Sequence, residues 1–283
     1  MSGIRHVYDV QLPGRGGGSL AVDLHFTGSA DEHPVLLWFH GGGWTRGGRR
    51  ASEEKILWPY ARAGLTVVSV GYRLSGEANH PAQLDDAFDA LAWLSDPESG
   101  YSFDTSRVFV GGGSAGGHIA SLVGVNLRRY RRRHGDALPP VRGVIVIYPV
   151  ANPLEYDAAK LAAGPPAPGT FAAWSLESTG GRPAQFGQAL LGPDPVLSPS
   201  PFLDSYRELV PTDVPPYLIQ HGSNDTDVPF SQSLLLYDTL SSQGVPTTLV
   251  LHSDADHGSP WFHRGLALDA VSAFVREHSA PPS

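Results

Sequence analysis

Hydrophobic and polar residues alternate at the start of the chain. Residues 6–12 and 20–26 both alternate, and the glycine-rich residues 15–18 lie between them. A period of two is typical of a strand with one face exposed, and a glycine-rich turn between two such runs favours a hairpin. The start of the chain therefore predicts a half-exposed antiparallel hairpin.

Further along, the alternation gives way to short and almost continuous hydrophobic runs that are rich in β-branched and aromatic residues. Runs of this kind are typical of strands buried on both faces, as in a parallel sheet. The runs lie at residues 35–39, 66–70, 107–110, 141–148, 217–220 and 247–251.

Segments with helical spacing separate several of these runs. Hydrophobic residues three or four positions apart occupy residues 83–94 and residues 234–240, and a Pro or Gly follows each segment. Alternating strands and helices imply crossover connections, and hence an α/β fold with a mostly parallel, twisted sheet and helices on both of its faces. Binding sites in such sheets lie beyond the carboxyl ends of the strands.

One long segment departs from this pattern. Residues 152–211 are rich in Pro and Gly, and only residues 158–163 and 183–191 show weak helical periodicity. We expect an inserted lid or substrate wall over the sheet; the alternative is a loop at the side of the domain. Because no repeat or linker divides the chain, residues 1–283 are predicted to form a single domain that contains this insertion.

The composition limits the catalytic groups and the partners that the chain can use more than it limits the fold. The 283 residues include no cysteine, which excludes disulfides, thiolate catalysis and iron–sulfur clusters and leaves hydroxyl, imidazole and carboxylate groups. The formal charge of −8 disfavours nucleic acid or an anionic membrane surface and favours a small-molecule partner. The basic run at residues 128–133 falls at the end of a predicted helix, where cations complement the helix dipole.

Targeting and metal signals are absent from the sequence. No apolar segment follows a basic start, and no run of about 18 apolar residues occurs, so we expect a cytoplasmic protein without a spanning helix. A His-Glu-x-x-His motif is also absent, and the spacing of Asp254, Asp256 and His257 suits a catalytic loop better than a metal cage. We expect neither a metal nor a cofactor.

The strongest chemical signal is a serine in a glycine-rich turn. Residues 112–117 read Gly-Gly-Ser-Ala-Gly-Gly, directly after the predicted strand at 107–110 and before a helical run at 118–127. A serine on a sharp strand-to-helix turn needs tiny neighbours, and its hydroxyl is then exposed as a nucleophile. We interpret Ser114 as that nucleophile, with the amide of Ala115 at the helix N-terminus as an oxyanion donor. A phosphate-binding loop is disfavoured because no Walker lysine follows.

A second glycine-rich motif, His-Gly-Gly-Gly-Trp, follows the predicted strand at 35–39. Three glycines allow the backbone to turn and present amides to a ligand, as in the oxyanion loop that accompanies a nucleophilic serine. We expect His40 to brace this loop through a backbone hydrogen bond and not to act as a base. Trp44 is interpreted equally as a wall of the acyl pocket or as part of the core.

A serine nucleophile needs a base and an acid that orients the base, and on this scaffold the expected order is Ser, Asp, His. Asp225 follows one late predicted strand and His257 follows the next. The rivals are Asp227 for the acid, and His252 and His263 for the base. Loop position favours Asp225 and His257.

These motifs together resemble the α/β-hydrolase superfamily, and more narrowly its carbohydrate acetyl esterase and feruloyl esterase-like branch near the hormone-sensitive-lipase-type esterases. The resemblance covers about residues 35–278. It is carried by HGGGW at 40–44, SVGYRL at 69–74, HPAQLDDAFDALAWL at 80–94, GGSAGGHIASL at 112–122 and PPYLIQHGSNDTDVPFSQSLLLYDTL at 215–240.

The resemblance implies an α/β-hydrolase fold with an inserted lid, and a serine hydrolase that cleaves a carboxylic ester. The site residues that it implies are the triad Ser114, Asp225 and His257, and the oxyanion-hole amides of Gly42, Gly43 and Ala115, with the Trp44 amide taking part in some relatives.

The chain departs from the family in three places. Gly113 stands where family members often have Glu or Asp. Because the first predicted strands begin almost at once, we expect no N-terminal helical cap of the usual kind. Asp254 and Asp256 add carboxylates near His257, where they would raise its pKa or bind a cationic group of the substrate. A lid must therefore come mainly from the segment at 152–211.

The sequence favours a serine esterase that acts on a small-molecule ester through an acyl-enzyme on Ser114. We expect Trp44, Phe230 and Trp261 to crowd the triad and to limit the acyl group to a short chain. The alternative is the same triad acting on an amide, formamide or lactone, or catalysing cyclisation or acyl transfer. A hydrolase fold used only for binding is disfavoured by the complete triad and oxyanion elements.

Overall fold

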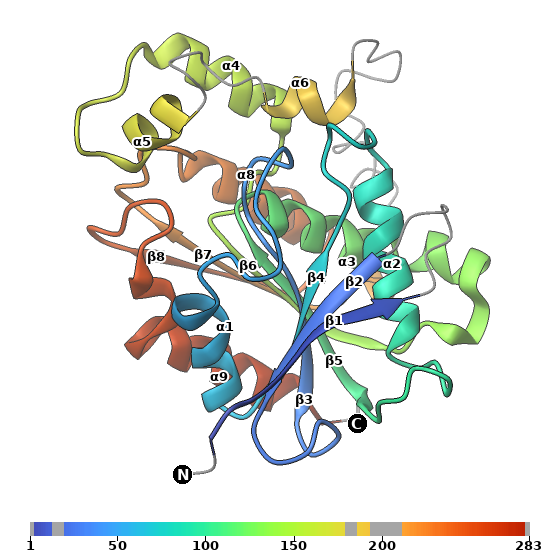
Figure 1. Cartoon of the computed structure of the whole chain (residues 1–283). Coiled ribbons are helices and arrows are strands. Elements are labelled where there is room, and N and C mark those ends of the chain that lie inside the picture. The colour runs from blue at the N-terminus through green and yellow to red at the C-terminus, as the bar shows by residue number, and fades with distance from the viewer. Residues whose placement is uncertain (1–2, 13–19, 179–185, 193–210, 281–283) are drawn as a thin grey trace.

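A twisted sheet of eight strands runs through the centre of the molecule (Figure 1). The computed structural model describes residues 3–12, 20–178, 186–192 and 211–280. The strands are β1 (Arg5–Leu12), β2 (Leu20–Phe26), β3 (Pro34–Phe39), β4 (Thr66–Gly71), β5 (Asp104–Gly113), β6 (Val141–Ile147), β7 (Tyr217–Gly222) and β8 (Thr247–His252).

The strand order across the sheet is β1-β2-β4-β3-β5-β6-β7-β8. β2 pairs antiparallel with both β1 and β4, and every other neighbouring pair is parallel. The mostly parallel sheet predicted from the hydrophobic runs is therefore confirmed.

Helices cover both faces of the sheet, as predicted. One face is covered by α2 (Ala82–Trp93), α3 (Ala115–His134) and α8 (Ser231–Ser242), and the other by α1 (Glu53–Arg62) and α9 (Gly265–His278). β3 shows why both faces are apolar: Val35 and Leu37 join the first core, while Leu36 and Trp38 join the second. Side chains of one strand alternate between faces, so a strand between two helix layers needs an unbroken hydrophobic run.

The opening hairpin is antiparallel as predicted, but only β1 is half-exposed; the expectation for β2 is wrong. All residues of β2 are buried, including the polar Asp23 and His25. Arg50 covers Asp23, with its Nε 2.9 Å from a carboxylate oxygen, and the His6 ring lies 2.8 Å from His25 between their Nδ1 atoms. Side chains from outside the strand therefore bury positions that the alternation marks as exposed.

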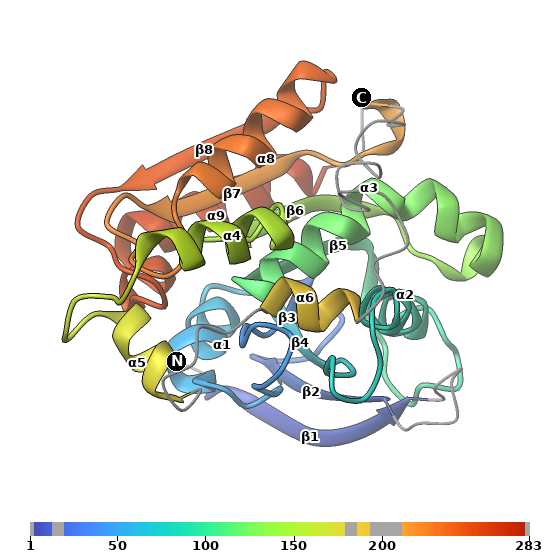
Figure 2. The same cartoon turned by 90° about the horizontal axis from the view of Figure 1, so that it is seen from above.

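The segment at 152–211 contributes helices near the carboxyl ends of the strands (Figure 2). Its described helices are α4 (Pro153–Ala163), α5 (Phe171–Ser178) and α6 (Phe186–Leu191), and residues 179–185 and 193–210 lie outside the described residues. Short 3₁₀ turns occur at Gly135–Ala137, Pro211–Asp213 and Pro260–His263.

Polar side chains tie these helices to each other and to the sheet layer. The Gln232 side chain, from α8, accepts hydrogen bonds from the amides of Ala151 and Asn152, just before α4 begins. Asp157 on α4 accepts a hydrogen bond from the Gln188 amide at the start of α6. The start of α4 is thus fixed to the domain, and α6 is fixed to α4.

The basic run at 128–133 ends α3, as predicted. Arg133 pairs with Asp85 and Arg128 pairs with Asp213, so part of this charge is neutralised within the chain. None of the described helices combines the length and the apolar character that crossing a membrane would need.

Candidate active site

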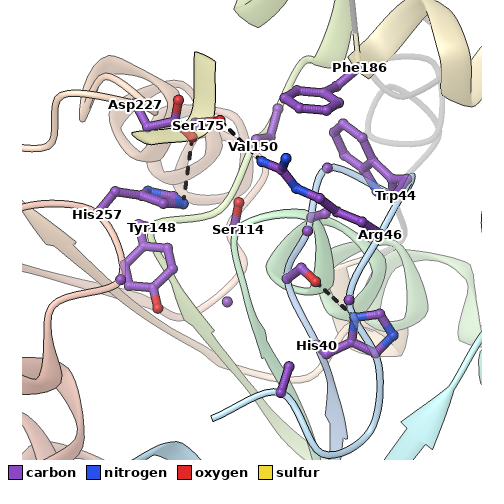
Figure 3. Close-up of a pocket in the computed structure, with 18 of the residues that line it drawn as sticks. His40, Trp44, Arg46, Ser114, Tyr148, Val150, Ser175, Phe186, Asp227 and His257 are labelled. Atoms are coloured by element: carbon purple, nitrogen blue, oxygen red, sulfur yellow. Dashed lines mark hydrogen bonds and ion pairs between the residues drawn. The ribbon is translucent and has the colours of Figure 1, made fainter. Parts of the chain in front are cut away.

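A cavity of about 380 Å³ opens beyond the carboxyl ends of the central strands (Figure 3). It is lined by the loop that follows β3, by the β5–α3 turn with Ser114, and by His257 from the loop that follows β8. Phe171 and Phe186, from α5 and α6, line it from the side of the inserted segment. The structure therefore brings the sequence motifs together around one cavity.

Ser114 occupies the turn between β5 and α3 in a strained backbone conformation. Its φ is 56° and its ψ is −122°, which an L-residue rarely adopts and which costs on the order of 1–3 kcal/mol. The surrounding sheet and helix hold this conformation, and the serine lies at the cavity between His257 and Arg46 (Figure 3).

The glycines of this turn allow the helix to approach the sheet. A Cβ on Gly116 would overlap the carbonyl oxygen of Phe39, and a Cβ on Gly112 would lie 2.7 Å from the same oxygen. Gly113, where related chains often carry an acid, is covered by the Tyr148 ring, which would lie 3.1 Å from a Cβ at that position. Any larger residue would force α3 or its neighbours to move.

The glycine loop after β3 takes a path that only glycine tolerates. Gly42 and Gly43 have φ of 127° and 60°, and a Cβ on Gly42 would overlap the carbonyl oxygen of Arg46. Gly41 lies so close to the nucleophile that its Cβ would be 3.4 Å from the Cβ of Ser114.

The amides predicted to form the oxyanion hole are available in this arrangement. Ala115 is the first residue of α3, so its amide has no acceptor within the helix. Within the described chain, the amides of Gly42 and Gly43 donate no hydrogen bond to the protein. All three residues line the cavity beside Ser114.

His257 is held by Asp225. Its Nδ1 lies 2.8 Å from Oδ2 of Asp225, whose side chain is fully buried. The other carboxylate oxygen, Oδ1, accepts hydrogen bonds from the amides of Asp227 and Val228, and His221 Nε2 lies 3.3 Å from Oδ2. Asp225 is thus positioned to fix which nitrogen of His257 carries the proton.

Charges around the imidazole favour its protonated form. Burial lowers the pKa of His257, but the carboxylates of Asp225, Asp227 and Asp256 outweigh this effect and raise the pKa above its ordinary value. Burial acts to raise the pKa of Asp225, yet His257 and His221 hold it well below its usual range. The expected effect of an additional acid near His257 thus holds for Asp256.

Asp256 also organises the loops around the base. Its Oδ1 accepts hydrogen bonds from the His257 amide at 2.7 Å and from the amide and hydroxyl of Thr226, both at 2.8 Å. Its Oδ2 accepts a hydrogen bond from the Phe171 amide at the start of α5. One carboxylate therefore connects the loops that carry Asp225 and His257 to the inserted segment.

The rival histidines lie elsewhere. His252 Nε2 is 2.7 Å from the Gln220 side-chain oxygen, and His263 Nδ1 is 3.0 Å from the Tyr60 hydroxyl. Burial lowers the pKa of His263 to about 3, so it is neutral at physiological pH. Neither ring lines the cavity.

The rival acid, Asp227, does line the cavity. Its Oδ2 lies 4.0 Å from Nε2 of His257, the nitrogen opposite the one that Asp225 contacts, and its Oδ1 forms an ion pair with Lys160 on α4. Among the described contacts, the Ser114 hydroxyl makes no hydrogen bond with Nε2. Catalytic hydrogen bonds are often long in structures without substrate and shorten when substrate binds.

His40 braces the glycine loop, as predicted. Its Nδ1 lies 2.8 Å from the carbonyl oxygen of Gly41, and its ring stacks on Tyr72 at 4.3 Å between centroids. Burial lowers its pKa to about 4, so the ring is neutral at physiological pH.

The structure separates the three residues expected to crowd the acyl pocket. Trp44 lines the cavity and is fully buried, with its ring 5.2 Å from that of His118. Phe230 and Trp261 do not line the cavity, and their exposed fractions are 38% and 44%. The expectation that they limit the acyl group is therefore not supported by the lining of this cavity, although both residues follow Asp225 or His257 closely in sequence.

Other side chains lie beside His257 and along the cavity. Tyr148 lies against His257 with ring centroids 4.4 Å apart, and Phe171 lies against it at 4.8 Å. Arg46 donates a hydrogen bond to the Ser175 hydroxyl and lies over the Phe186 ring. The sequence shows Arg46 two residues beyond the glycine motif, but nothing in it shows that this side chain reaches the inserted segment.

The described residues contain no group of three or more His, Asp or Glu side chains arranged to hold a metal ion. The polar groups that line the cavity include a hydroxyl, an imidazole, a carboxylate and backbone amides.

Comparisons with known proteins identify the family to which the chain belongs. The sequence profile of the family described as alpha/beta hydrolase fold matches residues 36–260. A probable carboxylic ester hydrolase of Mycobacterium tuberculosis is 30% identical over 222 residues, which cover 77% of this chain and 46% of that protein. An ethyl acetate hydrolase of Pseudomonas putida is 33% identical over 150 residues, which cover 52% of this chain and 45% of that protein.

The chain thus spans less than half the length of these curated relatives. Among solved structures, an esterase of Pyrobaculum calidifontis superposes with a TM-score of 0.72 at 25% identity, covering 97% of this chain and 84% of the other.

Proposed function

The chain belongs to the alpha/beta hydrolase fold family, and from this premise we propose that it is a serine esterase that cleaves small carboxylic esters. The observation that carries the proposal is that Ser114 and His257 line one cavity beside the glycine loop, while the buried Asp225 contacts His257 Nδ1. The named relatives, which are ester hydrolases, support the same reaction type.

In the proposed reaction, Nε2 of His257 takes the proton of the Ser114 hydroxyl as its oxygen attacks the ester carbonyl. The carbonyl oxygen becomes an oxyanion and accepts hydrogen bonds from the amides of Gly42, Gly43 and Ala115. His257 then donates the proton to the leaving alcohol, and an acyl-enzyme remains on Ser114. A water molecule, deprotonated by the same base, releases the carboxylic acid.

Asp225 contributes by holding the proton of His257 on Nδ1, which leaves Nε2 free to act as the base. The 2.8 Å contact from a fully buried carboxylate also stabilises the imidazolium that forms in each transition state.

We further propose that α4, α5 and α6 form the lid of this site and that the acyl group is short. Gly43 has no room for a side chain because the Phe186 ring would lie 2.7 Å from its Cβ, so α6 closes the cavity directly over the glycine loop. The similarity to an ethyl acetate hydrolase supports acetate as the first acyl group to test. Membership of the narrower carbohydrate acetyl esterase branch stays a prediction.

The test is labelling with a fluorophosphonate probe, followed by rates for p-nitrophenyl esters of increasing acyl length. We expect Ser114 to be labelled and the acetate or propionate ester to be cleaved fastest, with the Ser114→Ala variant inactive in both assays. A p-nitroanilide of the same acyl group should react much more slowly. Faster anilide cleavage would favour the amidase alternative, and an unlabelled wild-type protein would contradict the proposal.

A further inference from the structure

An ion pair between the lid and a catalytic loop faces the reactive nitrogen of His257. Asp227 Oδ2 lies 4.0 Å from Nε2 (Figure 3). Asp225 contacts the other ring nitrogen, Nδ1. The other oxygen of Asp227 pairs with the Lys160 ammonium. The side chains are 7% and 21% exposed, so water screens this pair only weakly.

The charged, titratable and aromatic groups that face the His257 imidazole come from several elements. The loop after β7 supplies Asp225 and Asp227, and the loop of His257 itself supplies Asp256. The end of β6 supplies the Tyr148 phenol, and α5 supplies the uncharged Phe171 ring.

The three carboxylates lie at different positions around the His257 ring. Asp225 contacts Nδ1, and Asp256 accepts hydrogen bonds from backbone amides and from a hydroxyl, not from the ring. Asp227 is the described carboxylate that lies within 4.0 Å of Nε2, the atom that must be unprotonated to receive the serine proton. A negative charge beside that atom favours its protonated, inactive form.

Lys160 belongs to α4, which is held by hydrogen bonds that involve neither Lys160 nor Asp227. α4 begins at the hydrogen bonds from Ala151 and Asn152 to Gln232, and it holds α6 through Asp157. Lys160 is in the second half of α4, with its ammonium 5.5 Å from the centre of the Tyr156 ring. The distance between Lys160 and Asp227 therefore depends on how α4 lies over the site.

We propose that Lys160 and Asp227 control the strength of the catalytic base: the Asp227 carboxylate holds a proton on His257, and the Lys160 ammonium weakens that hold when α4 lies over the site. The inference rests on the proposed esterase function. Both are positioning residues, since they act through His257 and not on the reacting atoms. A lid helix displaced from Asp227 would leave its charge uncompensated and make His257 a weaker catalyst at neutral pH.

The direction in which each variant shifts the pKa of His257 follows from the charge that the substitution removes. The base works when His257 is neutral, so kcat/KM falls as the pH drops through the pKa of His257. Removing the carboxylate in Asp227→Asn lowers that pKa, and activity persists to lower pH. Removing the ammonium in Lys160→Gln raises it, and activity is lost at higher pH.

The experiment is the pH dependence of kcat/KM for p-nitrophenyl acetate in the wild type and four variants. We expect the acid limb to move down by about one pH unit in Asp227→Asn and up by a smaller amount in Lys160→Gln. Lys160→Arg keeps the charge and should restore the wild-type limb. The matched control is Asp213→Asn, which breaks the surface ion pair between Asp213 and Arg128. Arg128 lies 14 residues beyond Ser114 and therefore about 20 Å along α3. The pH profile of this control should not move.

A second measurement separates this inference from the proposed function. The protonation of His257 is followed directly by NMR of ¹⁵N-labelled imidazoles, with the signal assigned by its loss in His257→Gln. Opposite displacements of this titration in Asp227→Asn and Lys160→Gln would support the inference even if no ester were hydrolysed. Unmoved titrations, or displacements of the same sign, would overturn it even in an active esterase.

Discussion

Replacing Asp225 with asparagine removes one charge from the site and leaves its volume almost unchanged. The Asp225 carboxylate receives backbone hydrogen bonds from Asp227 and Val228 on one oxygen and contacts His257 Nδ1 with the other. An asparagine that keeps the two backbone hydrogen bonds must turn its NH₂ group toward Nδ1. Because two donors cannot face each other, the imidazole proton moves to Nε2, and the base can no longer accept a proton from Ser114.

The distance between Asp225 and His257 sets the size of the expected fall in rate. Two unit charges 2.8 Å apart interact with about 6 kcal/mol at an effective dielectric constant of about 20. If this stabilisation of the imidazolium is lost in the transition state, the rate falls about 10⁴-fold, at 1.36 kcal/mol per factor of ten. In Asp227→Asn the lost contact is longer, at 4.0 Å, makes no hydrogen bond to the ring and is opposed by Lys160. We expect that variant to change kcat by less than about tenfold near neutral pH.

The assay is kcat and KM for p-nitrophenyl acetate in both variants, with thermal unfolding to show that each is folded. The loss in Asp225→Asn should fall on kcat, because the serine and the cavity remain intact. A loss below about tenfold in Asp225→Asn, or equal losses in the two variants, would refute the assignment of Asp225 as the acid of the triad.

Three further predictions test the remaining parts of the site. Ser114→Ala should remain folded and lose several orders of magnitude in ester turnover; a variant that retained a tenth of wild-type activity would rule out this nucleophile. Gly42→Ala places a methyl group against a backbone carbonyl at a φ of 127°, so the glycine loop must move, and kcat should fall by about 10²-fold while fluorophosphonate labelling slows in parallel. Alanine at Tyr156, Phe171 or Phe186, compared for a bulky aryl ester and for p-nitrophenyl acetate, should change KM more for the bulky ester; unchanged selectivity in all three would show that these helices are not a specificity lid.

The sequence predicted the parts of the protein that local chemistry determines. The β-branched runs favoured strands buried on both faces, which holds for the inner strands but not for the edge strand β8, and the glycines around Ser114 favoured a turn where helix and strand backbones touch. His40 was predicted as a brace because its position before the glycine loop keeps its ring below the site. These features depend on neighbours in sequence, which is why they can be read without a structure.

Features that depend on distant packing were not predicted. β2 alternates like an exposed strand, yet Arg50 and His6 cover its polar residues. Phe230 and Trp261 follow Asp225 and His257 closely in sequence, but the direction of an aromatic side chain is set by the loop path, and neither lines the cavity. Arg46 reaches Ser175 across 129 positions, a contact that no local pattern encodes.

The contact between Gly43 and Phe186 restricts how this protein can change over evolution. The Phe186 ring fills the space that a side chain at position 43 would need, so the glycine loop and α6 form complementary surfaces. A foreign lid grafted onto this scaffold would leave a void above the loop or collide with it, and α6 would have to be exchanged together with α4, which holds it through Asp157. We therefore expect substitutions within the inserted segment to alter substrate range more readily than exchange of the whole segment.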